Sequence, residues 1–95
     1  MHFLYILKCS DGSLYTGTTH DPDRRLHEHQ SGADRKSYTY PRRPVERIHV
    51  EPFSSENDAL AAERKIKKWS RAKKLAYVAG DWAEVSKLAK KQFNT

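Results

Sequence analysis

The side chains in this sequence whose types and spacing suit chemistry are two tyrosines, an arginine, a histidine and a glutamate: Tyr5, Tyr15, Arg25, His29 and Glu63. The second tyrosine follows the first by ten residues, the arginine follows ten residues later, and the histidine comes one helical turn after it. Phenol, imidazole and carboxylate groups transfer protons, a guanidinium binds phosphate oxygens through two hydrogen bonds, and a carboxylate can hold a divalent cation. This set suits attack of water on a phosphodiester.

Each of these side chains also has an ordinary structural explanation. The two tyrosines can be half-buried strand aromatics, and the arginine and histidine can lie on a solvated helix face. Glu63 can pair with Lys67, four residues later on the same helix. The order of all five along the chain, rather than any one of them, supports the functional interpretation.

Two segments at the start of the chain predict a β-hairpin. Residues 3–8 are apolar, aromatic or β-branched at both alternating positions, which is typical of a strand covered on both faces. Turn residues 10–13 lead to residues 14–19, which are rich in β-forming side chains.

The length of the hairpin loop decides which side chains share a face, and two lengths are compatible with the sequence. A two-residue loop sets Lys8 opposite Tyr15 and leaves Tyr5 on the other face. A three-residue loop over 11–13 pairs Cys9 with Tyr15 and brings the two tyrosines together. A site that contains both tyrosines therefore requires a loop with an odd number of residues, or an equivalent bulge.

The segment after the hairpin predicts a helix. Asp21 suits the N-cap position, with a proline at the first helical position, and the helix is expected to run to about Gln30 with Gly32 as its left-handed cap. Arg25 and His29 are four residues apart and share a face of this helix.

Residues 31–44 predict a basic, aromatic loop, because glycine, serine and proline alternate there with basic residues and two tyrosines. Residues 45–51 then alternate in polarity and predict a third strand. In that strand Ile48 and Val50 are expected on one face, and Pro52 is expected to end it.

The capping-box spacing at residues 55–58 opens a second helix. Its apolar positions repeat every three or four residues, and its final tryptophan is therefore expected in the core rather than stacked on a base. These positions are Ala59, Ala62, Ile66 and Trp69. Glu63 lies about 60° from the middle of this stripe, where a carboxylate needs a partner.

The end of the chain predicts two further short helices, over about 71–79 and 82–93. Gly80 separates them, and a second capping signal begins at Asp81. Residues 64–74 contain seven basic residues and no acidic one.

Five ordered motifs together resemble the GIY-YIG nuclease superfamily, most closely its small standalone bacterial members. They are Phe3-Leu4-Tyr5, Asp11-Gly12-Ser13-Leu14-Tyr15-Thr16-Gly17, Arg24-Arg25-Leu26-His27-Glu28-His29, Arg42-Arg43-Pro44-Val45 and Glu63-Arg64-Lys65-Ile66-Lys67-Lys68. The resemblance covers about residues 3–79, although the first triplet lacks the family's glycine. It implies one α+β domain over residues 1–95, with a small three-stranded antiparallel sheet flanked by helices and a C-terminal helical extension from about 80.

The resemblance also implies roles for the five side chains. Glu63 would bind one divalent metal, Mg²⁺ or Mn²⁺, as a hard cation that keeps several waters. Arg25 would hold the phosphate, and His29 would relay a proton or position the phosphate. Tyr5 and Tyr15 would lie near the attacking water, and which of them orients it or acts as general base is left open.

The charge of the chain favours a polyanionic partner, nucleic acid first and an acidic membrane surface second, and the resemblance to the nuclease superfamily implies DNA and no membrane. Lys and Arg number 18 against 12 Asp and Glu, giving a net charge of +6. No base-reading helix is apparent, so sequence specificity is not expected. The basic residues are expected to hold the nucleic-acid backbone, and Tyr38 is expected to stack on bases if the strand is single. The predicted nucleic-acid-binding residues are Arg35, Lys36, Tyr38, Arg42, Arg43, Lys67, Lys68, Lys73 and Lys74.

Composition excludes several other classes. A single cysteine, Cys9, rules out a disulfide framework and a Cys-based zinc site, and no apolar run approaches the ~20 residues of a membrane span. Without a signal-peptide pattern, we expect a soluble cytoplasmic protein. The sequence therefore predicts a metal-dependent endonuclease that hydrolyses phosphodiester bonds of DNA, either single-stranded or structured. The alternatives are a non-cleaving nucleic-acid-binding module that retains the nuclease fold, and a basic adaptor that binds protein only.

Overall fold

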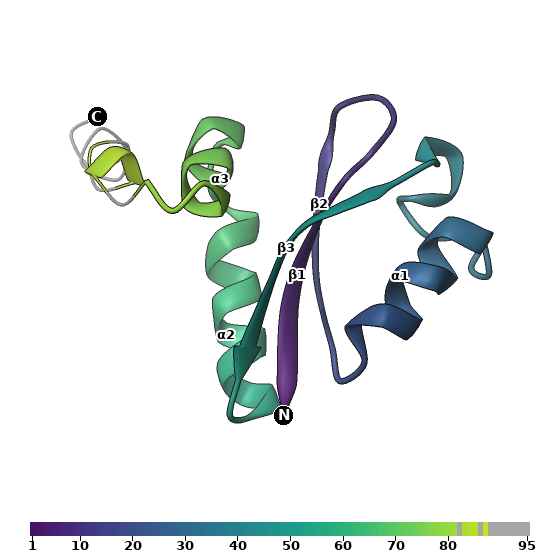
Figure 1. The fold of residues 1–95 in the computed structure, drawn as a ribbon, viewed down its shortest axis with the longest axis horizontal. Coiled ribbons are helices and arrows are strands. Elements are labelled where there is room, and N and C mark those ends of the chain that lie inside the picture. Colours follow the sequence, from purple (N-terminus) through teal and green to yellow (C-terminus); the bar gives the residue numbers. More distant parts are fainter. Residues whose placement is uncertain (82, 86, 88–95) are drawn as a thin grey trace.

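The structure is a computed structural model that describes residues 1–81, 83–85 and 87. Its elements follow the order β1 (His2–Lys8), β2 (Leu14–Thr19), α1 (Pro22–Ser31), the short 3₁₀ helix η1 (Tyr40–Arg42), β3 (Glu46–Phe53), α2 (Glu56–Lys67) and α3 (Arg71–Val78). The strands form one antiparallel sheet, with α1 on one side and α2 and α3 on the other (Figure 1). The predicted α+β architecture is confirmed.

β1 is the middle strand of the sheet, in the order β2-β1-β3. Leu4 and Ile6 pack with Ile66 of α2 in one apolar cluster, and Tyr5 and Leu7 belong to a second cluster on the opposite face. All four β1 side chains are buried, which explains why this strand is apolar at both alternating positions.

The hairpin loop spans residues 10–12, so it has three residues but begins one position earlier than expected. A 2.9 Å hydrogen bond from the Cys9 backbone N–H to the carbonyl of the residue after the loop closes it. Tyr15 consequently pairs with Leu7 instead of Cys9. This pairing differs by two residues from the expected one and keeps the side-chain alternation, so Tyr5 and Tyr15 still share a face. The alternative of a two-residue hairpin loop, which would place the tyrosines on opposite faces, is wrong.

β3 contains a β-bulge that its alternating sequence did not predict. The register against β1 shifts between Ile6 and Leu7, because Ile48 is an extra residue in β3. Ile48 packs with the cluster of Ile6, whereas Val50 pairs with Tyr5 on the opposite face and is 41% exposed. The prediction that Ile48 and Val50 share a face is therefore wrong. The strand also continues through its proline, which the edge position of β3 permits.

The helix boundaries follow local capping signals. Asp21 accepts a backbone N–H at 3.1 Å at the start of α1, and Gly32 ends that helix with a φ of 73°. Ser55 caps α2 in the same way at 3.2 Å. Asp81 also accepts a backbone N–H at 3.1 Å, but most of the predicted helix over 82–93 lies outside the described residues. None of the helices in the described part of the chain is long and apolar enough to cross a membrane.

Trp69 follows α2 and packs in the core, as predicted. Its ring lies edge-on to Tyr77 of α3, with centroids 5.5 Å apart, and the Lys73 ammonium lies 4.2 Å from the indole centroid. Lys73 is only 5% exposed. This corrects its predicted role as a nucleic-acid contact, because its ammonium group is used inside the fold in a cation–π interaction.

Candidate active site

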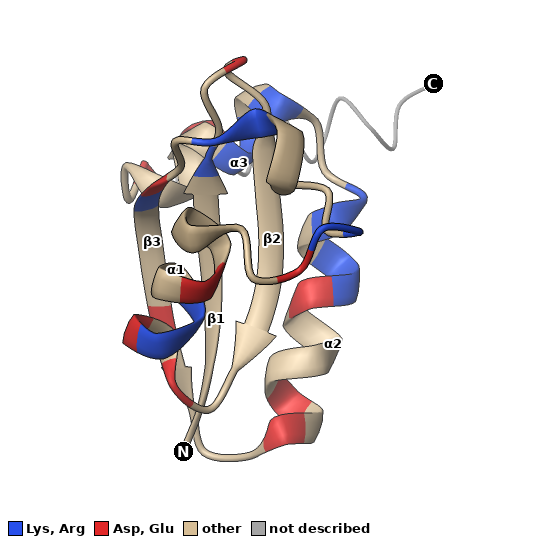
Figure 2. Ribbon diagram, turned by 90° about the vertical axis from the view of Figure 1, so that its right-hand side faces the viewer, with Lys and Arg blue, Asp and Glu red and all other residues tan. Residues whose placement is uncertain are grey.

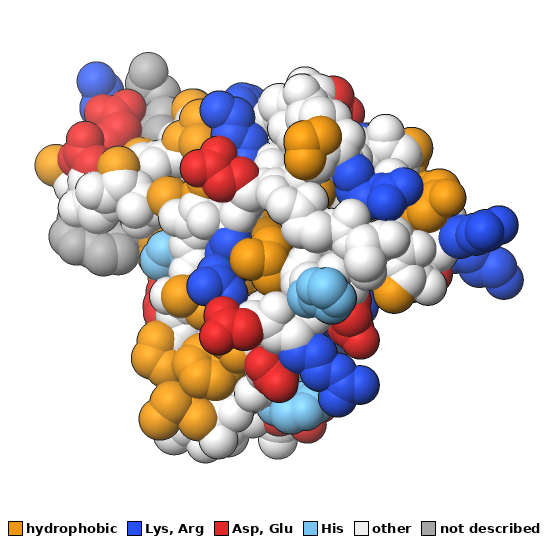
Figure 3. Space-filling view, turned by 45° about the vertical axis from the view of Figure 1, so that its right-hand side comes forward, with side chains coloured by type: hydrophobic (Ala, Val, Ile, Leu, Met, Phe, Trp, Pro, Cys, Tyr) orange, Lys and Arg blue, Asp and Glu red, His pale blue; other side chains and the backbone are white. Residues whose placement is uncertain are grey.

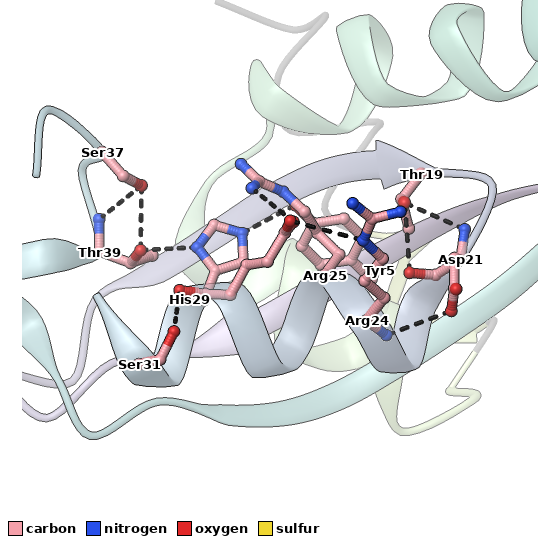
Figure 4. Close-up of polar contacts among 10 residues, drawn as sticks. Tyr5, Thr19, Asp21, Arg24, Arg25, His29, Ser31, Ser37 and Thr39 are labelled. Carbon is pink, nitrogen blue, oxygen red and sulfur yellow. Dashed lines mark hydrogen bonds and ion pairs between the residues drawn. The ribbon is translucent and has the colours of Figure 1, made fainter. Parts of the chain in front are cut away.

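Two tyrosines from adjacent strands and two side chains of α1 meet on the face of the sheet that α1 covers. The Tyr5 hydroxyl lies 3.0 Å from His29 Nε2 (Figure 4). The positive charge of Arg25 acts on the Tyr5 phenol, while the Arg25 guanidinium pairs with Glu28 at 3.2 Å. The Tyr15 ring stands edge-on to the His29 ring, with centroids 5.3 Å apart. The structure thus brings together four of the five predicted catalytic side chains.

Gly17 makes room for the Tyr5 side chain. The two residues are paired across β1 and β2, and a Cβ at position 17 would lie 2.5 Å from the Tyr5 hydroxyl oxygen and 2.6 Å from Cζ. Real Cβ contacts almost never come closer than 3.0 Å. The glycine of the Tyr-Thr-Gly triplet is therefore a requirement of close packing beside the Tyr5 hydroxyl.

His29 is buried and neutral at physiological pH. Burial, and after it the positive charge of Arg25, lower the pKa of His29 from 6.5 to about 4. Only 3% of this residue is exposed. A neutral imidazole carries one N–H and one lone pair, so the ring can accept a proton on one nitrogen while donating from the other.

Tyr5 is protonated at physiological pH. Burial, followed by the neighbouring Tyr15, raises the pKa of Tyr5 to about 12, while Arg25 acts in the opposite direction through its hydrogen bond and its charge. A buried phenol of this kind can take a proton from water only if it passes its own proton on. The lone pair on His29 Nε2 offers an acceptor at hydrogen-bond distance.

Thr39 also belongs to this cluster, although the sequence did not predict it. Its Oγ1 atom lies 2.7 Å from His29 Nδ1, and the residue is 1% exposed. Thr39 lies in the loop before η1 and in none of the motifs, so no sequence signal marks it. Only the folding of the loop against α1 places it beside the histidine.

Three of the five predicted nucleic-acid contacts in the loop between α1 and β3 have partners inside the protein. Tyr38 is 44% exposed, but its ring stacks with Tyr15 at 6.1 Å between centroids, and the Arg42 guanidinium lies 3.8 Å from its centre. Arg42 also pairs with Asp11 of the hairpin loop at 3.1 Å. Arg43 packs on the neighbouring tyrosine ring of η1. These side chains anchor the loop, whereas Arg35 and Lys36 are exposed.

Glu63 approaches the site from α2, beyond β2. Its side chain is 17% exposed, and its Oε1 lies 2.9 Å from Lys67 Nζ, which is the ordinary ion pair that the spacing allowed. Its charge also contributes to raising the pKa of Tyr5, so the carboxylate lies within electrostatic range of the phenol.

The predicted divalent cation would be held by a single carboxylate of the protein. No group of three or more His, Cys, Asp or Glu side chains that could hold a metal occurs among the described residues. Mg²⁺ and Mn²⁺ do not need such a group, since they retain several waters and bind one or two carboxylates together with substrate phosphate. Glu63 is the side chain that would hold such an ion.

A hollow of about 430 Å³ opens beside Arg25, between α1, the end of β2 and the start of α2. Its lining includes the hydroxyl residues Thr18 and Thr19, together with Arg24 and Glu56. Arg25 therefore lies between the Tyr5 phenol and an open hollow, and its guanidinium pairs with Glu28 in the lining of that hollow at 3.2 Å.

Basic residues gather on the C-terminal half of α2, above the acidic residues at its start (Figure 2). We define the α2–α3 basic surface as Lys67, Lys68 and Lys74. The first two are exposed, and burial together with the charge of Lys67 lowers the pKa of Lys74, which indicates closely spaced positive charges. The face drawn in Figure 3 mixes Lys and Arg with acidic side chains instead of forming one continuous basic patch.

Comparison with known proteins identifies the family. The family described as the GIY-YIG catalytic domain matches residues 1–76. A UPF0213 protein of Bacillus pumilus is 47% identical over 77 residues, covering 81% of this chain and 78% of its own, and one of Staphylococcus saprophyticus is 45% identical over 78 residues, covering 82% and 94%.

Two structures determined by solution NMR are also similar. The UPF0213 protein of Bacillus halodurans has a TM-score of 0.54 at 42% identity and covers 82% of each chain. A protein of E. faecalis has a TM-score of 0.60 at 42% identity and covers 86% of each chain. Because the family match spans residues 1–76 and these relatives share more than 40% identity over most of the chain, the chain belongs to the GIY-YIG catalytic domain family.

Proposed function

We propose that this protein is a metal-dependent endonuclease that hydrolyses phosphodiester bonds of DNA. The observation that carries the proposal is the buried Tyr5 hydroxyl, which lies 3.0 Å from His29 Nε2 and within electrostatic range of Arg25, beside an open hollow. A proton acceptor and a phosphate-binding cation are thereby placed together. Membership of the GIY-YIG endonuclease superfamily supports the same reaction class.

The side chains of the cluster divide the work of phosphodiester hydrolysis between them. Arg25 binds the oxygens of the phosphate and offsets the charge that develops on them. Tyr5 takes a proton from the attacking water while its own proton passes to His29. The Tyr15 ring packs against the imidazole and borders the place where water would enter. A cation on Glu63, when bound, would polarise the phosphate and acidify a bound water.

The proposed partner is DNA, bound mainly through its phosphates. Arg35, Lys36 and the α2–α3 basic surface supply exposed or half-exposed positive charge on either side of the site. Such contacts carry no base information, so cleavage specificity is expected to come from DNA shape rather than sequence. A cytoplasmic location remains part of this proposal.

The decisive experiment is incubation of the purified protein with single-stranded, double-stranded and branched DNA and with RNA, in Mg²⁺, Mn²⁺ or EDTA. We expect DNA cleavage in either metal and none in EDTA. The matched control is Arg25→Lys, which keeps the positive charge but loses the two-pronged guanidinium, and which we expect to bind DNA without cutting it. Metal-independent cleavage, or full activity in this variant, would contradict the proposed mechanism.

A non-cleaving nucleic-acid-binding module is the second candidate, favoured by the ion pair between Glu63 and Lys67. In that case the carboxylate supports the fold and holds no cation. The same incubation separates the two functions, because the module would retain salt-sensitive DNA binding but show no cleavage under any metal condition.

A further inference from the structure

The loop between α1 and β3 places two hydroxyl side chains behind the candidate active site. Thr39 Oγ1 lies 2.7 Å from His29 Nδ1, and Ser37 Oγ lies 3.0 Å from Thr39 Oγ1 and accepts the Thr39 backbone N–H at 3.3 Å. A continuous chain of hydrogen bonds therefore runs from the Tyr5 hydroxyl through His29 and Thr39 to Ser37 (Figure 4). Thr39 is buried, and Ser37 is half-buried at the outer end.

The direction of this chain follows from the requirement that buried hydrogens have acceptors. The positive charge of Arg25 acts on the Tyr5 phenol, which favours turning the oxygen lone pairs toward the guanidinium and the phenol hydrogen away from it. His29 Nε2, at 3.0 Å, is the acceptor that the described side chains provide. The neutral imidazole then carries its hydrogen on Nδ1 and donates it to Thr39 Oγ1, whose own hydrogen goes to Ser37 Oγ.

The segment that carries these hydroxyls is itself fixed over the site. The Tyr38 ring, between the two hydroxyl residues, stacks with Tyr15, while Arg42 packs on Tyr38, donates to its carbonyl at 2.7 Å and pairs with Asp11. Two contacts to the hairpin thus hold the loop in place. The Thr39 hydroxyl consequently meets His29 with a defined geometry instead of sampling several.

We propose that Thr39 and Ser37 are positioning residues that hold His29 as its Nδ1–H tautomer, with the Nε2 lone pair directed at the Tyr5 hydroxyl. The catalytic consequence rests on the nuclease function proposed above, whereas the tautomer itself does not. As water gives a proton to the Tyr5 oxygen, the Tyr5 hydroxyl proton passes to Nε2, and His29 becomes a cation. The resulting hydroxide forms a bond to phosphorus as the scissile P–O bond breaks, and the leaving oxygen takes up a proton from solvent. With the opposite tautomer Nε2 would already carry a hydrogen and could not accept that proton.

The same arrangement explains how a weakly basic ring can accept a proton during the reaction. Burial and the charge of Arg25 hold the pKa of His29 near 4 in the free protein. An anionic phosphate bound to Arg25 would offset the effect of the Arg25 charge on the pKa of His29. The Thr39 hydroxyl would still accept the hydrogen of Nδ1 when His29 is an imidazolium. Substrate binding is therefore expected to make His29 more basic.

The test compares Thr39→Val, which keeps the branched shape but removes the hydroxyl, with Thr39→Ser, which keeps the hydroxyl. Thr16→Val is the matched control: Thr16 is 3% exposed, and its hydroxyl is the buried side-chain oxygen for which the described residues offer no partner. Long-range ¹⁵N–¹H NMR of His29 reports which ring nitrogen is protonated. We expect Nδ1–H in the wild type, Thr39→Ser and Thr16→Val, and a mixture of tautomers in Thr39→Val.

Turnover provides the second readout. We expect Thr39→Val to lower kcat by roughly 10- to 100-fold with little change in KM, because the reacting groups are misplaced without loss of phosphate binding. Thr39→Ser should stay within about threefold of the wild type, since it restores the hydrogen bond to Nδ1. If Thr39→Val fails to fold, Ser37→Ala replaces it, with the same direction of change in tautomer and turnover.

Two results would overturn the inference: an Nε2–H tautomer in the wild type, or an unchanged tautomer and turnover in the hydroxyl-deleting variant. Absence of nuclease activity in the wild type would instead contradict the proposed function. The NMR measurement would still decide whether Thr39 and Ser37 set the tautomer.

Discussion

The space beside the Tyr5 hydroxyl leads to a prediction about Gly17→Ala. The added Cβ would lie 2.5 Å from the Tyr5 oxygen, whereas ordinary contacts begin near 3.4 Å, so the phenol must retreat by about 0.9 Å. Tyr5 is 3% exposed and packed among buried neighbours, so its ring cannot move this far without disturbing them. The 3.0 Å hydrogen bond to His29 would also be broken or badly aligned.

We expect this overpacking to cost about 1–3 kcal/mol of unfolding free energy. For a domain of this size that corresponds to a fall in Tm of roughly 5–20 °C, measurable by circular dichroism. A displacement of nearly 1 Å at a reacting group should in addition lower cleavage by about 100-fold at a temperature where the variant is still folded.

Gly12→Ala is the control, because it changes a glycine outside the site. Nothing lies within 4 Å of a Cβ at position 12, and the cost there arises from the backbone φ of 84° alone. This variant should lose about 1–2 kcal/mol of stability and keep wild-type cleavage. If Gly17→Ala matched the wild type in Tm and cleavage, or if the two variants lost activity equally, the proposed role of close packing at Tyr5 would be refuted.

Three further predictions concern the charges of the molecule. Glu63→Gln should abolish cleavage in an oligonucleotide assay while retaining DNA binding and losing no more than about 1 kcal/mol of stability, and full activity would end the metal assignment. Replacing the α2–α3 basic surface with alanine should weaken DNA binding and reduce the slope of log affinity against log salt by up to about 3, and an unchanged slope would move the contact to the loop between α1 and β3. Because the pKa of His29 is about 4 in the folded protein against 6.5 in the unfolded chain, the unfolded chain binds the extra proton between these values, and stability should fall as the pH is lowered through this window. In the wild type, the slope of unfolding free energy against pH between 4 and 6.5 should include roughly one proton taken up by His29 on unfolding, and His29→Gln should remove that contribution. An unaltered slope in this variant would show that His29 is not buried and neutral in the wild type.

Local features of the fold were predictable because local chemistry determines them. Asp21 and Ser55 cap their helices through hydrogen bonds to backbone groups a few residues away, and Gly32 ends α1 because only a left-handed residue closes it there. The ordered motifs were sufficient to indicate the family. The tyrosines lie in the motifs of the two hairpin strands, and the arginine and histidine lie in the motif of α1. The α+β class followed from the same elements.

Pairing register and side-chain partners depended on contacts between distant segments. The three-residue loop and the bulge at Ile48 are differences of one or two residues that an alternating pattern does not resolve, yet the bulge decides that Val50 faces away from Ile48. Lys73 belongs to a basic run in sequence, but packing against Trp69 buries it.

The sequence by itself indicated the candidate chemistry, because the ordered motifs that carry Tyr5, Tyr15, Arg25, His29 and Glu63 resemble those of a known family. Only the tertiary structure decided what surrounds each group, such as the Thr39 hydroxyl at 2.7 Å from His29 Nδ1. The physical reason is that burial, hydrogen-bond direction and pKa depend on neighbours brought together by packing, and residues ten or more positions apart leave no local pattern that records their meeting.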